Sequence, residues 1–290
     1  VGLALQATGL IIVTNQPIEI RNNQLSCHSG GRVVIAVPSN SASTVEIAHG
    51  NTLVLDVDYA FTNLNVLRLG TTGAGKKCTL NMNGKTLVVG QLTHAAGIVN
   101  ASVCAITSET PAFLVVNQTA NTTVTNLFRG PVHLVKGLAG ALWLAGTNAM
   151  SAGILVTGGT LRVGHPELVD AARVPLAIPV TNQAWYEIRA PGLLVSANTF
   201  VGSGTNRAWS PQGVVNLTSD SPDFVGAWQV YSGALWASSS YALGAHNAGA
   251  VYLNTQGGPP GSQALWLSGD IGITGKLAVT SGRGFTNITS

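Results

Sequence analysis

One stretch of this sequence occurs twice. Residues 153–164 (GILVTGGTLRVG) recur in degenerate form as residues 227–237 (AWQVYSGALWA). In both copies apolar and polar residues alternate, a glycine intervenes and the alternation resumes, which is the two-residue period of short strands with one buried face. One such unit cannot bury its apolar face alone, so its repetition predicts a stack of coils, a solenoid. We therefore expect an all-β fold whose shape by itself implies no reaction.

Weaker copies extend the pattern toward both ends of the chain. Residues 49–55 match residues 83–89, with glycines at positions 50 and 84, and residues 274–279 have the same form. The anchor glycines of the two best copies are Gly159 and Gly233, and the distance between them along the chain predicts two coils of comparable size. Because the spacing is irregular, we expect imperfect coils with loop insertions.

No proline-rich or charged linker divides the chain. We therefore expect a single elongated domain over residues 1–290, with irregular coils over 1–129 and repeat-like coils over 130–290. The segment around residues 180–212 is the least repetitive and suits an insertion that resembles a β-sandwich.

The alternation also predicts which side chains face the core. Those placed at the two-residue period beside the anchor glycines are Leu142, Leu144, Leu155, Leu161, Val163, Val230 and Leu235. One short helix is expected over residues 164–172, where Pro166 and Glu167 suit the first turn. The corresponding residues of the second copy, 238–244, predict a single turn before a strand over 251–253.

Composition favours an exported protein. Charged residues make up only 9% of the chain, whereas ordinary soluble domains have about 25%. With 46% hydrophobic residues, the surface is built from Thr, Ser, Asn, Gln and Gly, which is typical of extracellular or cell-surface β proteins. The longest apolar runs fall far short of the roughly 18 residues of a membrane-spanning helix, so no transmembrane segment is predicted.

The basic charge does not indicate a nucleic-acid partner. The net charge of +3 comes from 14 Lys and Arg that are scattered singly, apart from Lys76-Lys77. Nucleic-acid binding needs a clustered basic face. The three cysteines, Cys27, Cys78 and Cys104, contain no CxxC pair and do not suggest a metal site. We favour the interpretation that all three cysteines are small buried side chains in strands, and the alternative is one disulfide with one free thiol.

Catalytic groups are sparse, and we predict neither an enzyme nor a cofactor. Asp56 and Asp58 form the one i, i+2 carboxylate pair on a good strand pattern, which would place both on one face for a substrate or Ca²⁺. Solvated residues beside a turn are the favoured alternative. Asp220 and Asp223 suit turn capping, and the six His are isolated. A glycosidase would need two convergent carboxylates, which this pattern does not provide.

Aromatic residues give the one indication of a ligand. Trp185, Tyr186 and Trp209 lie in the least repetitive segment, where adjacent rings could stack on a sugar. Packing in the core or at an interface is the favoured alternative. The other tryptophans lie within alternating strands, which predicts core or lateral contacts for Trp143, Trp228, Trp236 and Trp266.

The segment that begins at residue 130 resembles a known repeat family. It contains in order a Lys-Gly step, a Gly-x-Leu-x-Leu strand, a Gly-x-Asn turn and a Val-x-x-Gly-x-Leu-x-x-Gly ending, at Lys136-Gly137, 140–144, 146–148 and 156–164. This pattern is similar to the autotransporter-associated β-strand repeat. The resemblance implies a right-handed parallel β-helix exported to a bacterial surface, with no catalytic residues inherent to the repeat. The sequence departs from the family in lacking a recognisable C-terminal membrane barrel.

Two classes of function follow. The favoured one is an extracellular structural protein, a subunit of a surface filament, sheath or layer, or the stalk of an adhesin. The alternative is a β-helix that binds or processes carbohydrate, such as a surface adhesin or phage tail-fibre segment, with a surface polysaccharide as partner. Self-association into an extended homopolymer is expected through the uncharged N-terminal stretch, Val1, Leu3, Leu5, Leu10, Ile11, Ile12 and Val13. Candidate glycosylation sequons begin at Asn100, Asn117, Asn121, Asn216 and Asn287.

Overall fold

The structure is a computed structural model that describes residues 3–6, 10–14, 24–28, 30–48, 50–70, 77–94, 104–165, 174–253, 263–268, 271, 277–278 and 288–289. Within these residues every regular element is a β-strand and every strand pair is parallel. The predicted all-β solenoid is therefore confirmed. None of the described elements is a helix that could cross a membrane. The chain forms two compact units, Val1–Ala152 and Gly153–Ser290.

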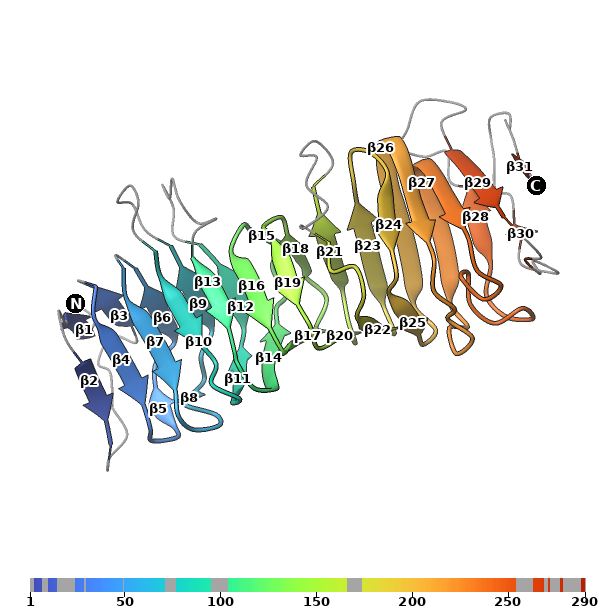
Figure 1. Cartoon of the computed structure of the whole chain (residues 1–290). Helices are drawn as coiled ribbons and strands as arrows, with labels where there is room; N and C mark the ends of the chain where they lie inside the picture. The colour runs from blue at the N-terminus through green and yellow to red at the C-terminus, as the bar shows by residue number, and fades with distance from the viewer. Residues whose placement is uncertain are drawn as a thin grey trace. The chain divides into compact units, whose positions relative to one another are not determined.

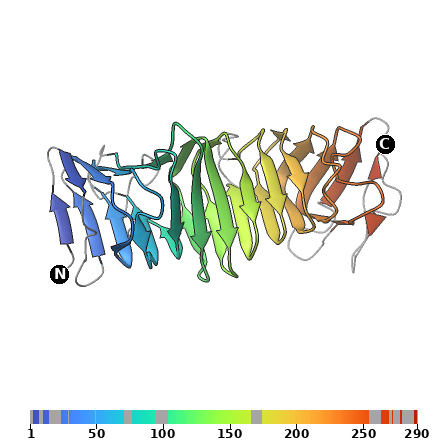
Figure 2. The same ribbon diagram turned by 90° about the horizontal axis from the view of Figure 1, so that it is seen from below.

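The first unit contains strands β1 to β19, which lie side by side as successive coils (Figures 1 and 2). Their bounds are β1 (Leu3–Gln6), β2 (Leu10–Val13), β3 (Gln24–His28), β4 (Arg32–Ile35), β5 (Asn40–Ser41), β6 (Thr44–Ile47), β7 (Thr52–Leu55), β8 (Phe61–Thr62), β9 (Val66–Leu69), β10 (Thr79–Asn81), β11 (Thr86–Val89), β12 (Gln91–Thr93), β13 (Ala105–Thr107), β14 (Ala112–Asn117), β15 (Thr122–Val124), β16 (Leu127–Gly130), β17 (Val132–Gly137), β18 (Ala141–Leu144) and β19 (Asn148–Met150). Two of its sheets have the strand orders β1-β3-β6-β9-β12 and β19-β16-β13-β10-β7-β4-β2. The other strands of this unit pair in the orders β11-β14-β17, β15-β18 and β5-β8.

The strand register shows that successive coils differ in length. Arg32 pairs with Thr52, and Thr52 pairs with Thr79, so the second of these two steps spans more of the chain than the first. The glycines at positions 50 and 84 precede β7 and β11, which belong to different sheets. The match between residues 49–55 and 83–89 therefore does not mark equivalent positions.

The second unit contains strands β20 to β31. Their bounds are β20 (Ile154–Val156), β21 (Thr160–Gly164), β22 (Pro179–Asn182), β23 (Trp185–Arg189), β24 (Leu194–Ser196), β25 (Thr199–Val201), β26 (Thr205–Leu217), β27 (Ala227–Ala237), β28 (Val251–Leu253), β29 (Gln263–Leu267), β30 (Leu277–Ala278) and β31 (Ile288–Thr289). One sheet runs β20-β22-β25 and another β21-β23-β26-β27-β28-β30, while β24 pairs with β26 and β29 pairs with β27 and β31. Residues 180–212, for which an insertion was expected, contribute β22 to β26 to these same sheets.

The two best sequence copies are separated by three coil steps. Thr160 pairs with Trp185, Trp185 with Thr205, and Thr205 with Ala227. The prediction of two coils between Gly159 and Gly233 is therefore wrong. It failed because the two anchor glycines are not equivalent in the fold: Gly226 directly precedes Ala227, as Gly159 precedes Thr160, whereas Gly233 lies further along β27.

Inward side chains stack in continuous rows. In the first unit one such row runs Val33, Leu53, Leu80, Ile106 and Phe128, and all of these side chains are fully buried. Full burial of such a side chain stabilises the fold by roughly 1.5–3 kcal/mol. The predicted inward residues Leu142, Leu144, Leu161, Val163, Val230 and Leu235 are confirmed as core.

Leu155 is the exception among the predicted inward residues. It is half-buried, whereas its neighbours Ile154 and Val156 are buried. Every residue of this strand is apolar, so no polar residue in the sequence shows which side chains point outward. The prediction for Leu155 is therefore wrong, because the inward positions are those on either side of it.

The predicted helix over 164–172 falls mainly on residues 166–173, which lie outside the described residues. The single turn over 238–244 is confirmed, since the backbone amides of Ala242 and Gly244 donate to the carbonyls of Ser239 and Tyr241. The strand expected over 251–253 is β28.

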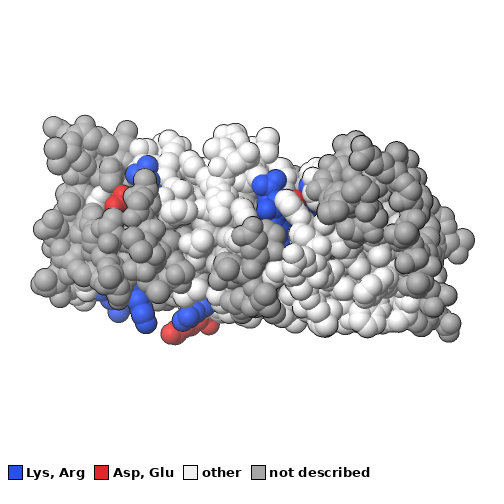
Figure 3. Space-filling model, turned by 90° about the horizontal axis from the view of Figure 1, so that it is seen from above, with Lys and Arg blue, Asp and Glu red and all other residues white. Residues whose placement is uncertain are grey.

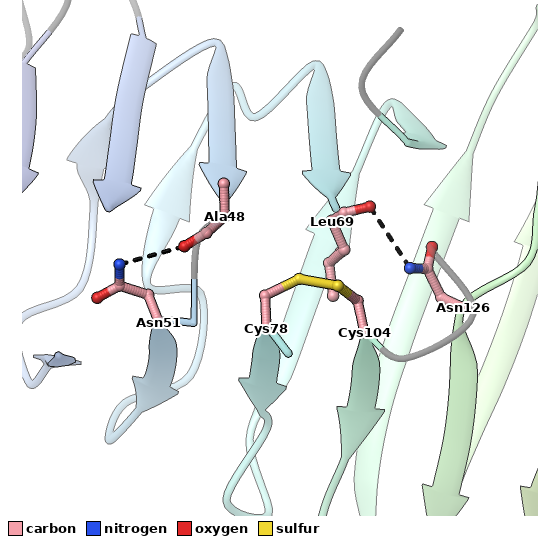
Figure 4. The surroundings of a disulfide bond; sticks show 6 residues. All are labelled: Ala48, Asn51, Leu69, Cys78, Cys104 and Asn126. Atoms are coloured by element: carbon pink, nitrogen blue, oxygen red, sulfur yellow. Dashed lines mark hydrogen bonds between the residues drawn. A yellow bond between two sulfur atoms is a disulfide. The ribbon is translucent and has the colours of Figure 1, made fainter. Parts of the chain in front are cut away.

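A disulfide links two neighbouring coils of the first unit. Cys78 and Cys104 directly precede the paired strands β10 and β13, with their Cα atoms 4.5 Å apart, and form a disulfide (Figure 4). Asn51 and Asn126 hold the equivalent place before β7 and β16, and their Nδ2 atoms donate to the carbonyls of Ala48 (3.2 Å) and Leu69 (3.4 Å). The disulfide and the Asn126 hydrogen bond therefore join different coils, whereas the Asn51 hydrogen bond stays within its own turn.

The favoured expectation of three reduced cysteines is wrong, and the alternative of one disulfide with one free thiol is confirmed. The free thiol belongs to Cys27, whose burial raises its pKa to about 12.

A buried lysine closes the turn after β17. Lys136 is fully buried, and its Nζ donates to the carbonyls of Gly137 (2.6 Å) and Leu138 (3.1 Å). Leu138 has a φ of +59°, in the left-handed region. Burial lowers the pKa of Lys136 to about 8. The Lys-Gly step of the sequence thus supplies donors for carbonyls that the turn would otherwise leave unpaired.

Candidate functional site

The described surface is poor in charge. Figure 3 shows one face on which most described atoms belong to neither acidic nor basic residues. In the second unit, charged and aromatic side chains meet on β21, β23, β26 and β27. We call this group the arginine–aromatic cluster, and its members are Arg162, Trp185, Glu187, Arg189, Arg207, Trp209, Gln229 and Tyr231.

Strand register brings the charged members together. Arg162 pairs with Glu187, Glu187 with Arg207, and Arg207 with Gln229. Neighbouring strands lie about 4.8 Å apart, so four consecutive strands place these side chains in one row. Trp185 and Arg189 lie two positions before and after Glu187 and therefore share its face of β23.

Three guanidinium groups share one carboxylate. Glu187 is buried, and its Oε atoms lie 3.5 Å from Arg162 Nε and 3.1 Å from Arg207 Nη1. Arg189 Nε also donates to Glu187 Oε1. Burial lowers the pKa of Arg189, while the charge and hydrogen bond of Glu187 act in the opposite direction. One negative charge thus faces three positive charges within the described part of the cluster.

Aromatic rings flank the guanidinium groups. The Arg207 Cζ atom lies 4.9 Å from the ring centroid of Trp185 and 5.0 Å from that of Tyr231. Arg189 Cζ lies 3.9 Å from the Trp209 ring. Arg207 also donates to Gln229 Oε1 from Nη2 (3.2 Å). These cation–π contacts and hydrogen bonds fix the orientation of Arg207.

Arg162 differs from the other two arginines. Its side chain is 32% exposed, and its Nε lies within ion-pair distance of Glu187 without forming a hydrogen bond. Among the described residues, no other partner for its guanidinium group is found. Arg162 is therefore held less tightly than Arg189 and Arg207, and the exposed part of its side chain can meet a group from outside the chain.

The predicted sugar-stacking residues separate into two kinds. Tyr186 is fully buried against Phe200, with ring centroids 6.0 Å apart, and burial raises its pKa. Its ring is part of the core and cannot meet a ligand. Trp185 is 38% exposed, and Trp209 lies on the outer side with its ring 5.2 Å from Tyr231.

Sequence reasoning did not identify the charged members of the cluster. Glu187, Arg189 and Arg207 follow Arg162 at intervals that form no pattern until the coil length is known. Once the strand register is known, the cluster is recognised by charged residues that point outward at paired positions of successive strands.

Asp56 and Asp58 occupy a turn of the first unit. Strand β7 ends at Leu55, before both of them, and both carboxylates accept hydrogen bonds at the surface. Asp56 Oδ1 accepts from Asn83 Nδ2 (3.2 Å), and Asp58 Oδ1 accepts from the amide of Thr86 (2.7 Å). Turn stabilisation thus accounts for both. No group of three or more metal-ligating side chains occurs within the described ranges.

The remaining tryptophans follow the core or lateral pattern. Trp228 is a core residue, packed edge-on against Phe200 with ring centroids 5.1 Å apart. Trp236 and Trp266 pair across neighbouring strands on the outer side, with ring centroids 6.2 Å apart.

The predicted self-association stretch is described in part. Strand β1 pairs with β3, β2 pairs with β4, and Leu10 and Ile12 on β2 are 59% and 53% exposed. Val1 lies outside the described residues, as do the side chains of Leu3 and Leu5.

Two predicted sequon asparagines, Asn117 and Asn121, are exposed. Asn216 is buried, and its Oδ1 accepts a hydrogen bond from Ser238 Oγ (2.6 Å). Asn100 and Asn287 are not within the described residues.

No protein-family model matches the sequence, and neither a curated protein nor a solved structure is significantly similar to it.

Proposed function

We propose that this chain is an extracellular structural β-solenoid, without catalytic activity, that associates with further copies of itself into a surface filament, sheath or layer. The contact is strand addition to β2, the last strand of its sheet in the first unit (Figure 1). The occupant of that edge is a second copy of this chain.

The observation that carries this proposal is the loss of burial at β2. Ile11 and Val13 continue the inward rows of Val33 and Ile35. Val33 and Ile35 are fully buried, whereas Ile11 and Val13 are only half-buried, because β4 is the one strand that pairs with β2 in the described part of the chain. The core therefore opens at this end.

The chemistry of β2 suits association. Its sequence, LIIV, contains no charge and no proline, the two features that commonly prevent strand addition at an edge. A further strand would pair its free backbone groups and cover Ile11 and Val13. A contact of this kind between different surfaces of identical chains repeats without closing, which generates an extended assembly.

The resemblance of residues 130–164 to the autotransporter-associated repeat supports export to a bacterial surface. So does the low content of charged residues, 9%. A structural role also agrees with the placement of Asp56 and Asp58 in a turn, where each carboxylate is bound by the chain itself.

Sedimentation velocity and electron microscopy of the purified protein at micromolar concentration test the proposal. The decisive variant is Ile12→Lys, which adds a charge to the exposed side of β2. Leu138→Lys is its matched control, because Leu138 has the same exposed fraction, 53%, in a turn of the same unit.

We expect extended assemblies of the wild type and of Leu138→Lys, and dispersed Ile12→Lys. A wild-type protein that stays monomeric at these concentrations, or equal assembly by both variants, would refute strand addition at β2.

A further inference from the structure

The outer surface of the second unit carries a platform beside two arginines. Trp185, the platform residue, is flanked in register by Thr160 on β21 and Thr205 on β26, and all three lie on the outer face. The next outward row, two positions further along the strands, is Arg162, Glu187 and Arg207. A partly exposed indole, two hydroxyl groups and two guanidinium groups thus adjoin one another.

The two arginines of this row differ in how firmly their side chains are held. The side chains of Arg162 and Arg207 are 32% and 23% exposed, and both form ion pairs with the carboxylate of Glu187. Arg189 donates a hydrogen bond to the same carboxylate. Arg162 and Arg207 stand two strand spacings apart, about 10 Å, on either side of β23. Arg207 is held in place by Gln229 and two rings, whereas Glu187 is the one partner of Arg162 among the described residues.

We propose that this surface binds an acidic polysaccharide. A carboxylate or sulfate group of the sugar accepts hydrogen bonds from Arg162 and gains the charge of Arg207, while an adjoining sugar ring stacks on Trp185. Guanidinium groups suit such anions because their donors match two acceptor oxygens at once. Thr160 and Thr205 offer hydroxyl groups to the ring that lies on Trp185.

A sugar fits this surface better than a nucleic acid. Nucleic-acid binding follows the number of phosphates neutralised, and the described part of this surface offers only two partly exposed arginines. The inference does not depend on assembly through β2, which belongs to the other unit. It is therefore tested on dispersed Ile12→Lys protein.

Isothermal titration calorimetry with four probes tests the proposal: octagalacturonate (carboxylated), a heparin octasaccharide (sulfated), maltooctaose (neutral) and an oligothymidylate of equal length. The variants are Arg162→Gln and Trp185→Thr, the latter matching its two neighbours in the row. Arg129→Gln is the charge-matched control, since Arg129 is an exposed arginine of the first unit. Circular dichroism verifies that each variant is folded.

We expect one or both acidic oligosaccharides to bind and maltooctaose not to bind. Arg162→Gln should weaken binding about tenfold to a hundredfold, the effect of losing a hydrogen bond to a charged group. Trp185→Thr should also weaken it, and Arg129→Gln should not. Binding of only one acidic probe identifies the anion as carboxylate or sulfate.

Three results would overturn the proposal. They are no binding of either acidic probe at millimolar concentration, an equal effect of Arg162→Gln and Arg129→Gln, or oligothymidylate binding as tight as that of the acidic probes.

Discussion

Replacing the buried lysine of the first unit, Lys136→Met, should change the free energy of unfolding by an amount that depends on pH. Two contributions oppose each other. Methionine leaves the carbonyls of Gly137 and Leu138 without the donors that Nζ provides, at a cost of about 1–3 kcal/mol for the buried Gly137 bond and less for the partly exposed Leu138 bond. It also removes the penalty of burying a charge, which lowers the pKa of Lys136 from 10.5 to about 8.

The penalty has a defined size and pH range. At about 1.4 kcal/mol per pH unit, the difference between 10.5 and about 8 corresponds to at most about 3.5 kcal/mol. Below about pH 8 Lys136 is charged in both the folded and the unfolded states, so the full penalty applies. Between pH 8 and 10.5 the unfolded state binds more protons, and the lysine's contribution to the free energy of unfolding rises with pH.

Lys136→Met lacks this rise, so it should lose stability relative to the wild type as the pH increases from 7 to 10. Burial of Cys27 and Tyr186 acts in the opposite direction above about pH 9, but equally in both proteins, so the difference between them isolates Lys136. Urea unfolding followed by circular dichroism measures the difference, with the exposed Lys77→Met as the matched control. A difference between wild type and Lys136→Met that is constant over this range would refute the reasoning.

Replacing both Cys78 and Cys104 by serine should lower the free energy of unfolding by about 3.5 kcal/mol, because the unfolded chain regains the entropy of a loop closed over a sequence separation of 26. Urea titration should show a lower midpoint, and an unchanged midpoint would contradict this. Leu161→Ala should cost about 2–5 kcal/mol, whereas Leu155→Ala, half-buried, should cost much less; equal losses would place Leu155 in the core after all. The purified protein should not cleave any polysaccharide, and reducing-sugar release that is abolished by Asp56→Asn or Asp58→Asn would show that these turn residues are catalytic.

Alternation was sufficient to predict the class of fold and much of the core. Leu161 and Val163 are separated by the polar Arg162, so the phase of that strand was visible in the sequence. The strand at Leu155 is apolar throughout, and its phase was set by packing that the sequence does not display. Coil length was likewise hidden, because turns of different length separate strands that pair in register.

The candidate site was predictable only in part. Trp185 and Trp209 could be singled out as aromatic residues outside the repeat pattern. Glu187 and Arg207 could not be linked, because a charged residue on a strand is ordinarily solvated and their proximity depends on the register of β23 against β26. The disulfide was undecided for the same reason, since Cys78 and Cys104 are neighbours only once the coils are in register.

Parallel pairing in register is the central claim, and paired cysteines measure it most directly. Val115 and Val135 are half-buried register partners on β14 and β17. The double variant Val115→Cys, Val135→Cys should form a disulfide under mild oxidation, detected as a linked peptide by mass spectrometry. His133 lies two positions before Val135, which places its Cα about 8 Å from that of Val115, too far for a disulfide. Linkage of residues 115 and 135 but not of 115 and 133 is the predicted result, and the reverse would contradict the stacked coils.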